Sequence, residues 1–149
     1  MSDVTERTES MTTELEVVKT LELAAPPARV WKAITDPEEL AQWFPDEEAR
    51  VRVEEGAEGA WVWKEHGAYR VRFDTVEPPR RLVWSWARDP DVPLDQTVVT
   101  TVEWRLEPNG EGGTTLHVRE HGFVREEDRR QNDLGWDHEL GELAAHLER

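Results

Sequence analysis

Two Trp-x-Trp pairs limit the folds open to this chain more than any other feature. Trp61/Trp63 and Trp84/Trp86 lie in segments where apolar and polar residues alternate, so their four indoles are expected to project from the faces of β-strands. Burial of one aromatic side chain removes about 150–250 Å² from water, worth up to about 4–6 kcal/mol. The rings are therefore expected either to pack against each other and a helix or to enclose a cavity for an apolar guest.

Length and composition predict one domain over residues 14–149, after a polar, disordered lead at residues 1–13. The sequence has no cysteine, which excludes disulfides and thiolate metal ligands. No apolar run is long enough for a membrane span or typical of a secretory signal, so we expect a cytoplasmic protein without membrane insertion. The formal charge of -15, from 33 acidic and 18 basic residues, argues against nucleic acid as a partner.

The first part of the domain is predicted to contain one strand and two short helices. Apolar residues alternate over 15–23, where Lys19 interrupts the apolar face. The pair Pro26-Pro27 is typical of a helix start. A second helix is predicted to begin at Asp36, the expected N-cap, with Glu39 at the capping-box position.

Six strands and a long final helix are predicted to follow. Most outward strand positions are polar, which is typical of an antiparallel sheet with one covered face. Turn-forming residues separate the strands at 55–59, 66–67, 77–80 and 109–113, and a longer connection at 88–96 is expected to be a flap or rim. The helix, over 125–148, is expected to cover the sheet with Trp136, Leu140, Leu143, Ala144 and Leu147.

The turn at His66-Gly67 leaves two strand registers open. A two-residue loop pairs Trp63 with Arg70 and turns Trp61 and Trp63 to the polar face, whereas a three-residue loop pairs Trp63 with Val71. We favour the second register, because a slip of one residue moves every side chain of a strand to the other face and would expose the indoles.

Six groups of segments occur in the order and spacing of a known family. They are APPARVW (25–31), TDPEEL with WF (35–40, 43–44), EPPRRL (77–82), GTTL (113–116), EHGF (120–123), and GW before LAAHL (135–136, 143–147). In these segments the chain resembles the family named after the activator of Hsp90 ATPase, within the START/Bet v 1-like superfamily. The resemblance implies an α+β helix-grip fold (β-α-α-β6-α), in which a curved seven-stranded antiparallel sheet wraps around the C-terminal helix and leaves an elongated cavity.

An apolar chamber with a few polar points is the usual form of a small-ligand site. Large indoles can also fill such a chamber, and the sequence leaves both outcomes open. The residues expected to line the cavity are Trp43, Phe44, Trp61, Trp63, Tyr69, Phe73, Trp84, Trp86, Thr100, Trp104, Glu120 and Trp136.

Glu120 is the most specific of these candidates. It alternates in phase with Leu116 and Val118, so its carboxylate is expected to point toward the apolar side, where it needs a partner or takes up a proton. One interpretation makes it a general acid/base or the anchor of a cationic or hydroxylated guest. We favour the other, in which it pairs with an Arg or a Trp N–H near the cavity mouth.

No catalytic or metal-binding motif is recognisable, so we expect no catalytic residue, metal or cofactor. His117 and His121 share one strand face but lie about 13 Å apart in an extended chain, too far to bind one metal ion. Ser85 lies between two tryptophans on the opposite face, with no base at a suitable local spacing.

These observations predict a non-enzymatic protein that binds a small hydrophobic or aromatic molecule in the cavity. The alternative is an enzyme in the same cavity, similar to the polyketide cyclases and aromatases of the wider superfamily, which act mainly by folding a reactive chain. A second alternative is a stress-related interaction protein similar to Hsp90 co-chaperones. The resemblance does not lead us to expect Hsp90 as a partner, because the family's namesake activates it largely through another domain. The oligomeric state stays open, with a homodimer as one candidate.

Overall fold

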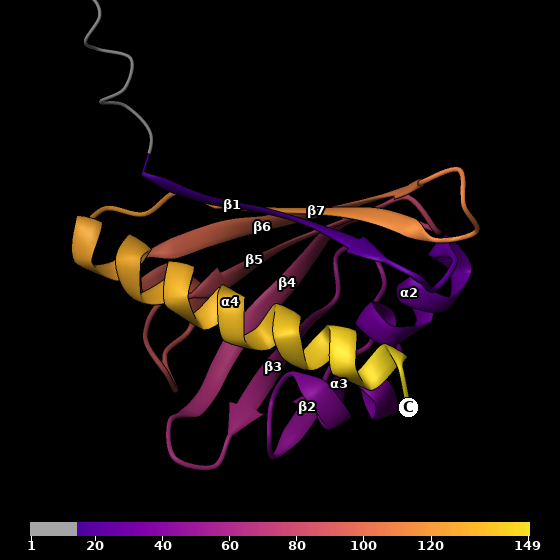
Figure 1. Ribbon diagram of the computed structural model, residues 1–149. Coiled ribbons are helices and arrows are strands. Elements are labelled where there is room, and N and C mark those ends of the chain that lie inside the picture. Colours follow the sequence, from indigo (N-terminus) through magenta and orange to yellow (C-terminus); the bar gives the residue numbers. More distant parts are fainter. Residues whose placement is uncertain (1–14) are drawn as a thin grey trace, which may run out of the picture.

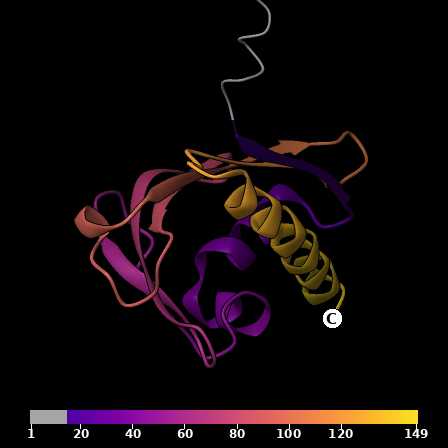
Figure 2. The ribbon, with the colours of Figure 1, turned by 90° about the vertical axis from the view of Figure 1, so that its left-hand side faces the viewer.

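A curved antiparallel sheet encloses the helices in the computed structural model, which describes residues 15–149 (Figures 1 and 2). The expected lead at residues 1–13 lies outside the described residues. The strands are β1 (Glu16–Leu23), β2 (Glu48–Arg50), β3 (Glu58–Trp63), β4 (Gly67–Glu77), β5 (Arg81–Ala87), β6 (Val99–Pro108) and β7 (Thr114–His121). Their order across the sheet is β1-β7-β6-β5-β4-β3-β2, which places β1 and β2 at the two edges.

Three α-helices follow the predicted order: α2 (Pro27–Thr35), α3 (Pro37–Trp43) and α4 (Glu126–Leu147). The connection between β5 and β6 contains a short 3-10 helix, η1 (Leu94–Gln96). The α+β helix-grip architecture is therefore confirmed. None of the helices within residues 15–149 combines the length and the apolar composition that crossing a membrane requires.

The β3–β4 hairpin confirms the predicted faces but corrects the register. Trp61 lies opposite Tyr69 and Trp63 lies opposite Gly67, so the pairing of Trp63 with Val71 is wrong. The loop consists of residues 64–66, and the backbone N–H of His66 donates to the carbonyl of Trp63 at 3.4 Å. Gly67 follows with φ +98°, the left-handed glycine that closes a three-residue hairpin loop.

An aromatic core fills the inner end of the space beneath the sheet. We use this name for Trp61, Phe73, Trp84 and Trp104, whose side chains have no solvent exposure. The ring centroids of Trp61 and Trp84 lie 5.0 Å apart, and those of Trp84 and Trp104 lie 5.6 Å apart. The three indole N–H groups find no acceptor among the described residues, so ring packing and apolar burial must offset their desolvation.

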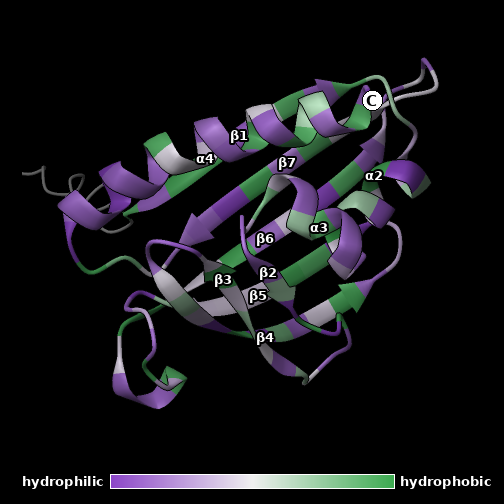
Figure 3. Cartoon of the chain, turned by 90° about the horizontal axis from the view of Figure 1, so that it is seen from below, coloured by the Kyte–Doolittle hydropathy of each residue, from purple (hydrophilic) through white to green (hydrophobic). Residues whose placement is uncertain are grey.

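Helix α4 contacts the rest of the fold through a narrow apolar stripe. Trp136, Leu140 and Leu143 are buried, whereas Figure 3 shows that most of the helix is hydrophilic. Its outer flank is tied to the edge strand β1, because Lys19 forms ion pairs with Asp133 and, at 2.9 Å, with Asp137. The interruption that Lys19 makes in the strand pattern is thus a contact with α4.

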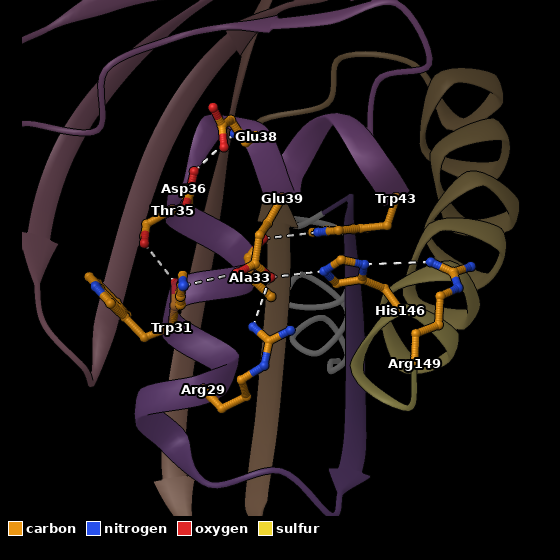
Figure 4. A network of polar contacts seen from close by, with 11 residues as sticks. Arg29, Trp31, Ala33, Thr35, Asp36, Glu38, Glu39, Trp43, His146 and Arg149 are labelled. Atoms are coloured by element: carbon orange, nitrogen blue, oxygen red, sulfur yellow. Dashed lines mark hydrogen bonds and ion pairs between the residues drawn. The ribbon is translucent and has the colours of Figure 1, made fainter.

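The C-terminal end of α4 is fixed to α2 and α3 by a polar network (Figure 4). Glu39 accepts from Arg29 at 2.7 Å and contacts the Nε2 atom of the buried His146 at 2.9 Å. Asp36 caps α3 as predicted, accepting from the Glu38 N–H at 2.9 Å. Glu39 does not complete the expected capping box, because its carboxylate is held in this network and the Asp36 N–H donates to Lys32 of α2.

Candidate functional site

A pocket of about 890 Å³ lies between the sheet and α4. This volume falls within the range of sites that bind small organic molecules. The pocket takes its wall from α3 and the residues after it, from strands β3 to β6, and from α4 with the loop that precedes it. Its aromatic lining residues are Trp43, Phe44, Trp63, Tyr69, Trp86 and Phe123.

The two sides of the pocket differ in chemistry. The side formed by the strands is aromatic, and Phe44, just after α3, continues it. The ring centroid of Phe44 lies 5.3 Å from that of Trp63 and 6.0 Å from that of Trp86. Helix α4 itself contributes no apolar side chain to the lining. Its lining residues recur every three or four positions, beside the buried apolar stripe of the helix. They are Asp128, Gln131, Asn132, Gly135, His138, Glu139 and Glu142.

The residues expected to line a cavity fall into three groups. Trp43, Phe44, Trp63, Tyr69, Trp86 and Thr100 line the pocket. The aromatic core residues Trp61, Phe73, Trp84 and Trp104 are packed behind the pocket and form none of its lining. Glu120 and Trp136 also lie behind the wall, and both are buried. The space between the sheet and α4 is therefore filled by the aromatic core at its inner end and forms the pocket at its other end.

Glu120 is fully buried and is surrounded by hydrogen-bond donors. Its Oε2 accepts from the Trp86 indole at 2.8 Å and from the Thr100 hydroxyl at 2.6 Å. Its Oε1 accepts from the Trp136 indole at 2.8 Å and from Asn132 at 3.1 Å. Within residues 15–149 no Lys or Arg forms an ion pair with this carboxylate. The favoured interpretation, pairing with a Trp N–H, is confirmed with two indoles and without an arginine.

These contacts give Glu120 a positioning role. Indole and amide N–H groups only donate, and each carboxyl oxygen of Glu120 accepts from one indole and from one further donor. Both oxygens are occupied, which leaves no lone pair directed at the pocket. Because Trp86, Thr100 and Asn132 belong to three different elements and all line the pocket, the buried carboxylate joins both of its sides.

The α4 side also holds carboxylates without partners. Neither Glu139 nor Glu142 forms a hydrogen bond or ion pair with a described residue. Burial, followed by the nearby charges of Glu142 and Asp46, raises the pKa of Glu139 to about 8. Burial likewise raises the pKa of Tyr69, with smaller effects of Asp89 and Asp91. Acids with strongly perturbed pKa values that lie in a cleft occur often at functional sites.

The sequence prediction missed these acids, Asn132 and Phe123. A signal for the helix residues was present, because the positions from Asp128 to Glu142 repeat every three or four residues beside the apolar stripe. Within residues 15–149 no group of three or more His, Asp or Glu is arranged to hold a metal ion.

Comparison with known proteins identifies the family. A family model described as "Activator of Hsp90 ATPase homolog 1-like protein" matches residues 24–148. The chain belongs to this family. The resemblance carried by the six groups of segments is thus confirmed for the Hsp90 ATPase activator homolog 1-like family. No curated protein matches the chain.

Solved structures include similar proteins. DynU16, described as a putative protein in the dynemicin biosynthetic locus, is 29% identical with a TM-score of 0.76, and the match covers 89% of this chain and 47% of DynU16. This chain thus spans about half the length of that protein. CalU16 from Micromonospora echinospora is 27% identical with a TM-score of 0.72, covering 89% of this chain and 75% of CalU16. The Aha1 dimer from Colwellia psychrerythraea, at 17% identity, TM-score 0.76 and coverage of 89% and 96%, shows the shared fold.

Proposed function

We propose that this protein binds a small hydrophobic or aromatic molecule in the pocket between the sheet and α4, without chemical turnover. One observation carries the proposal: a pocket of about 890 Å³ has a continuous aromatic side although the same molecule buries four other large rings completely. Four of the aromatic lining residues, Trp63, Tyr69, Trp86 and Phe123, are only partly buried. Apolar walls with a few directed polar groups are typical of ligand sites.

The polar groups of the pocket support binding rather than catalysis. The hydroxyl of Thr100, which lines the pocket, donates to the carboxylate of Glu120. The same carboxylate also accepts from two indoles and from the Asn132 amide. A general base must have a lone pair within reach of the substrate. Since the lone pairs of Glu120 are taken, its contacts favour a role in holding the wall.

Helix α4 offers a direct test through two glycines. A Cβ added at Gly135 or at Gly141 would meet no atom within 4 Å, and only Gly135 lines the pocket. Gly135→Phe is expected to fill the pocket, whereas Gly141→Phe is the matched control on the same helix. Quenching of Trp fluorescence by 2-naphthalenemethanol measures binding. We expect binding to the wild type and to Gly141→Phe and its loss in Gly135→Phe; equal binding by all three would contradict the proposal.

A second candidate is an enzyme of the cyclase type in the same pocket. It is favoured by the likeness to DynU16, which is described by its biosynthetic locus, and by the Tyr69 hydroxyl, which lines the pocket and forms no hydrogen bond with a described residue. Under this alternative, Tyr69→Phe lowers the turnover of a poly-ketone substrate and leaves its binding unchanged. If the wild type gives no turnover, this candidate fails while the binding proposal stands.

A further inference from the structure

The charges along the pocket are strongly unequal. Five acidic residues line it: Asp46, Glu65, Asp128, Glu139 and Glu142. Arg88 is the one Lys or Arg among the described lining residues, and it already contacts Asp89 at 3.2 Å and Asp128 at 3.6 Å. The pocket therefore presents carboxylates to a guest and no unpaired guanidinium or ammonium group.

Most other acids of α4 have partners: Asp133 and Asp137 share Lys19, Glu126 pairs with Arg129, and Asp128, which also lines the pocket, pairs with Arg125. Among the described residues Glu127 has no cation either, but it is exposed and lies outside the pocket. In contrast, Glu139 and Glu142 face the pocket without a cation. Glu139 is half-buried beside a second carboxylate, an arrangement that disfavours its charge until a positive group comes close.

The opposite side of the pocket suits the apolar body of an organic cation. Aromatic rings pack against such a body, and their faces also attract a positive charge that lies nearby. The centroids of Trp63 and Tyr69 lie 5.6 Å apart, and Trp86 lies beside Phe44 in the same surface. Trp86 donates its N–H to the Glu120 carboxylate, and this polarisation makes the face of the indole ring more negative.

We propose that the pocket selects organic cations, with the aromatic or aliphatic body of the guest against Trp63 and Trp86 and its ammonium group toward Glu139 and Glu142. This inference rests on the proposed binding function and adds the charge of the ligand. It predicts a preference for amines over neutral and anionic molecules of the same shape.

Three matched probes test this preference: 2-naphthylmethylamine, which is protonated at pH 7.5, the neutral 2-naphthalenemethanol, and 2-naphthoate. We expect the amine to bind about tenfold more tightly than the alcohol, as one charge-assisted contact predicts, and the naphthoate to bind most weakly. The alcohol binding as tightly as the amine would overturn the inference and leave the proposed function intact. Failure of all three probes to bind would overturn both.

Two variants separate the pocket carboxylate from general electrostatics. Glu139→Gln is expected to weaken amine binding about tenfold and so to remove most of the preference for the amine over the alcohol. Glu127→Gln makes the same substitution at an exposed position of α4 outside the pocket, and it is expected to change neither the amine affinity nor the preference. Unchanged amine affinity in Glu139→Gln would contradict the inference.

Proton release supplies a second measurement. Because Glu139 holds a proton near neutral pH, an arriving cation is expected to displace it, so the calorimetric heat should vary with the ionisation enthalpy of the buffer in wild type and not in Glu139→Gln. No buffer dependence in the wild type would contradict the assigned role of Glu139. The other titratable groups that line the pocket are Asp46, Glu65, His66, Tyr69, Arg88, Asp128, His138 and Glu142.

Discussion

Trp86 donates its indole N–H to the buried carboxylate of Glu120 at 2.8 Å while Trp86 itself lines the pocket. One contact therefore connects the interior of the protein to the wall of the pocket. The same carboxylate accepts from Asn132 on α4, so it joins the sheet to the helix.

Replacing Glu120 with Gln tests this connection. Each oxygen of Glu120 accepts from one indole, so in either orientation the new amide NH₂ would leave one buried indole N–H without its acceptor, and Glu120→Gln is expected to destabilise the fold by about 1–3 kcal/mol. Urea unfolding measures the loss, and Glu111→Gln in an exposed turn is the control. A stability equal to that of the wild type would show that the carboxylate is not needed to hold these elements.

The two members of the first Trp-x-Trp pair are expected to respond differently to truncation. Trp61 is fully buried in the aromatic core, so Trp61→Ala should cost about 3–5 kcal/mol of stability. Trp63 is partly exposed and lines the pocket, so Trp63→Ala should cost less stability and remove most of the affinity for a naphthyl probe. The two measurements are chemical unfolding and Trp fluorescence titration. Loss of binding without loss of stability in Trp61→Ala would reverse the assignment of core and pocket.

Glu39 is expected to stabilise the protein at neutral pH and not in acid. Burial alone would raise its pKa, but hydrogen bonds from His146 and Arg29 outweigh burial and lower the pKa below its ordinary value. A depressed pKa gives stability above the unfolded-state value and loses it as pH falls through the folded-state value. Glu39→Gln should therefore be less stable than wild type by about 1–2 kcal/mol at pH 7. The difference between the two proteins should shrink as the pH falls below the ordinary carboxyl range, and exposed Glu38 provides the control Glu38→Gln.

Glu139 is expected to behave in the opposite way. The pKa of Glu139 is raised to about 8. The stability that its protonated carboxyl group contributes is therefore fully present below pH 4.5 and is lost as pH rises through 8. Glu139→Gln should match wild type at pH 4 and melt about 2–4 °C higher at pH 9, which corresponds to about 1 kcal/mol after allowance for its partial exposure. Equal melting temperatures at pH 9 would show that the pocket solvates this carboxylate well.

Alternation along the strands predicted which face each side chain occupies, and proline and Asp36 located the helices. It could not predict the register of β3, because the pairing depends on whether Gly67 lies inside the turn or closes it. Nor could it predict depth: Trp61 and Trp63 share a face, yet one is enclosed by Phe44, Phe73 and Trp84 and the other borders the pocket. Phe44 contacts both indoles, and only Trp61 is also covered by Phe73 of β4 and Trp84 of β5, which alternation within β3 does not encode.

The most direct measurement is a crystal structure of the protein with 2-naphthylmethylamine. The account predicts density for the naphthyl ring against Trp63 and Trp86, its ammonium group near Glu139, and unchanged positions for Trp61, Trp84 and Trp104. Side chains filling the pocket, or a probe bound only on the outer face of the sheet, would contradict it.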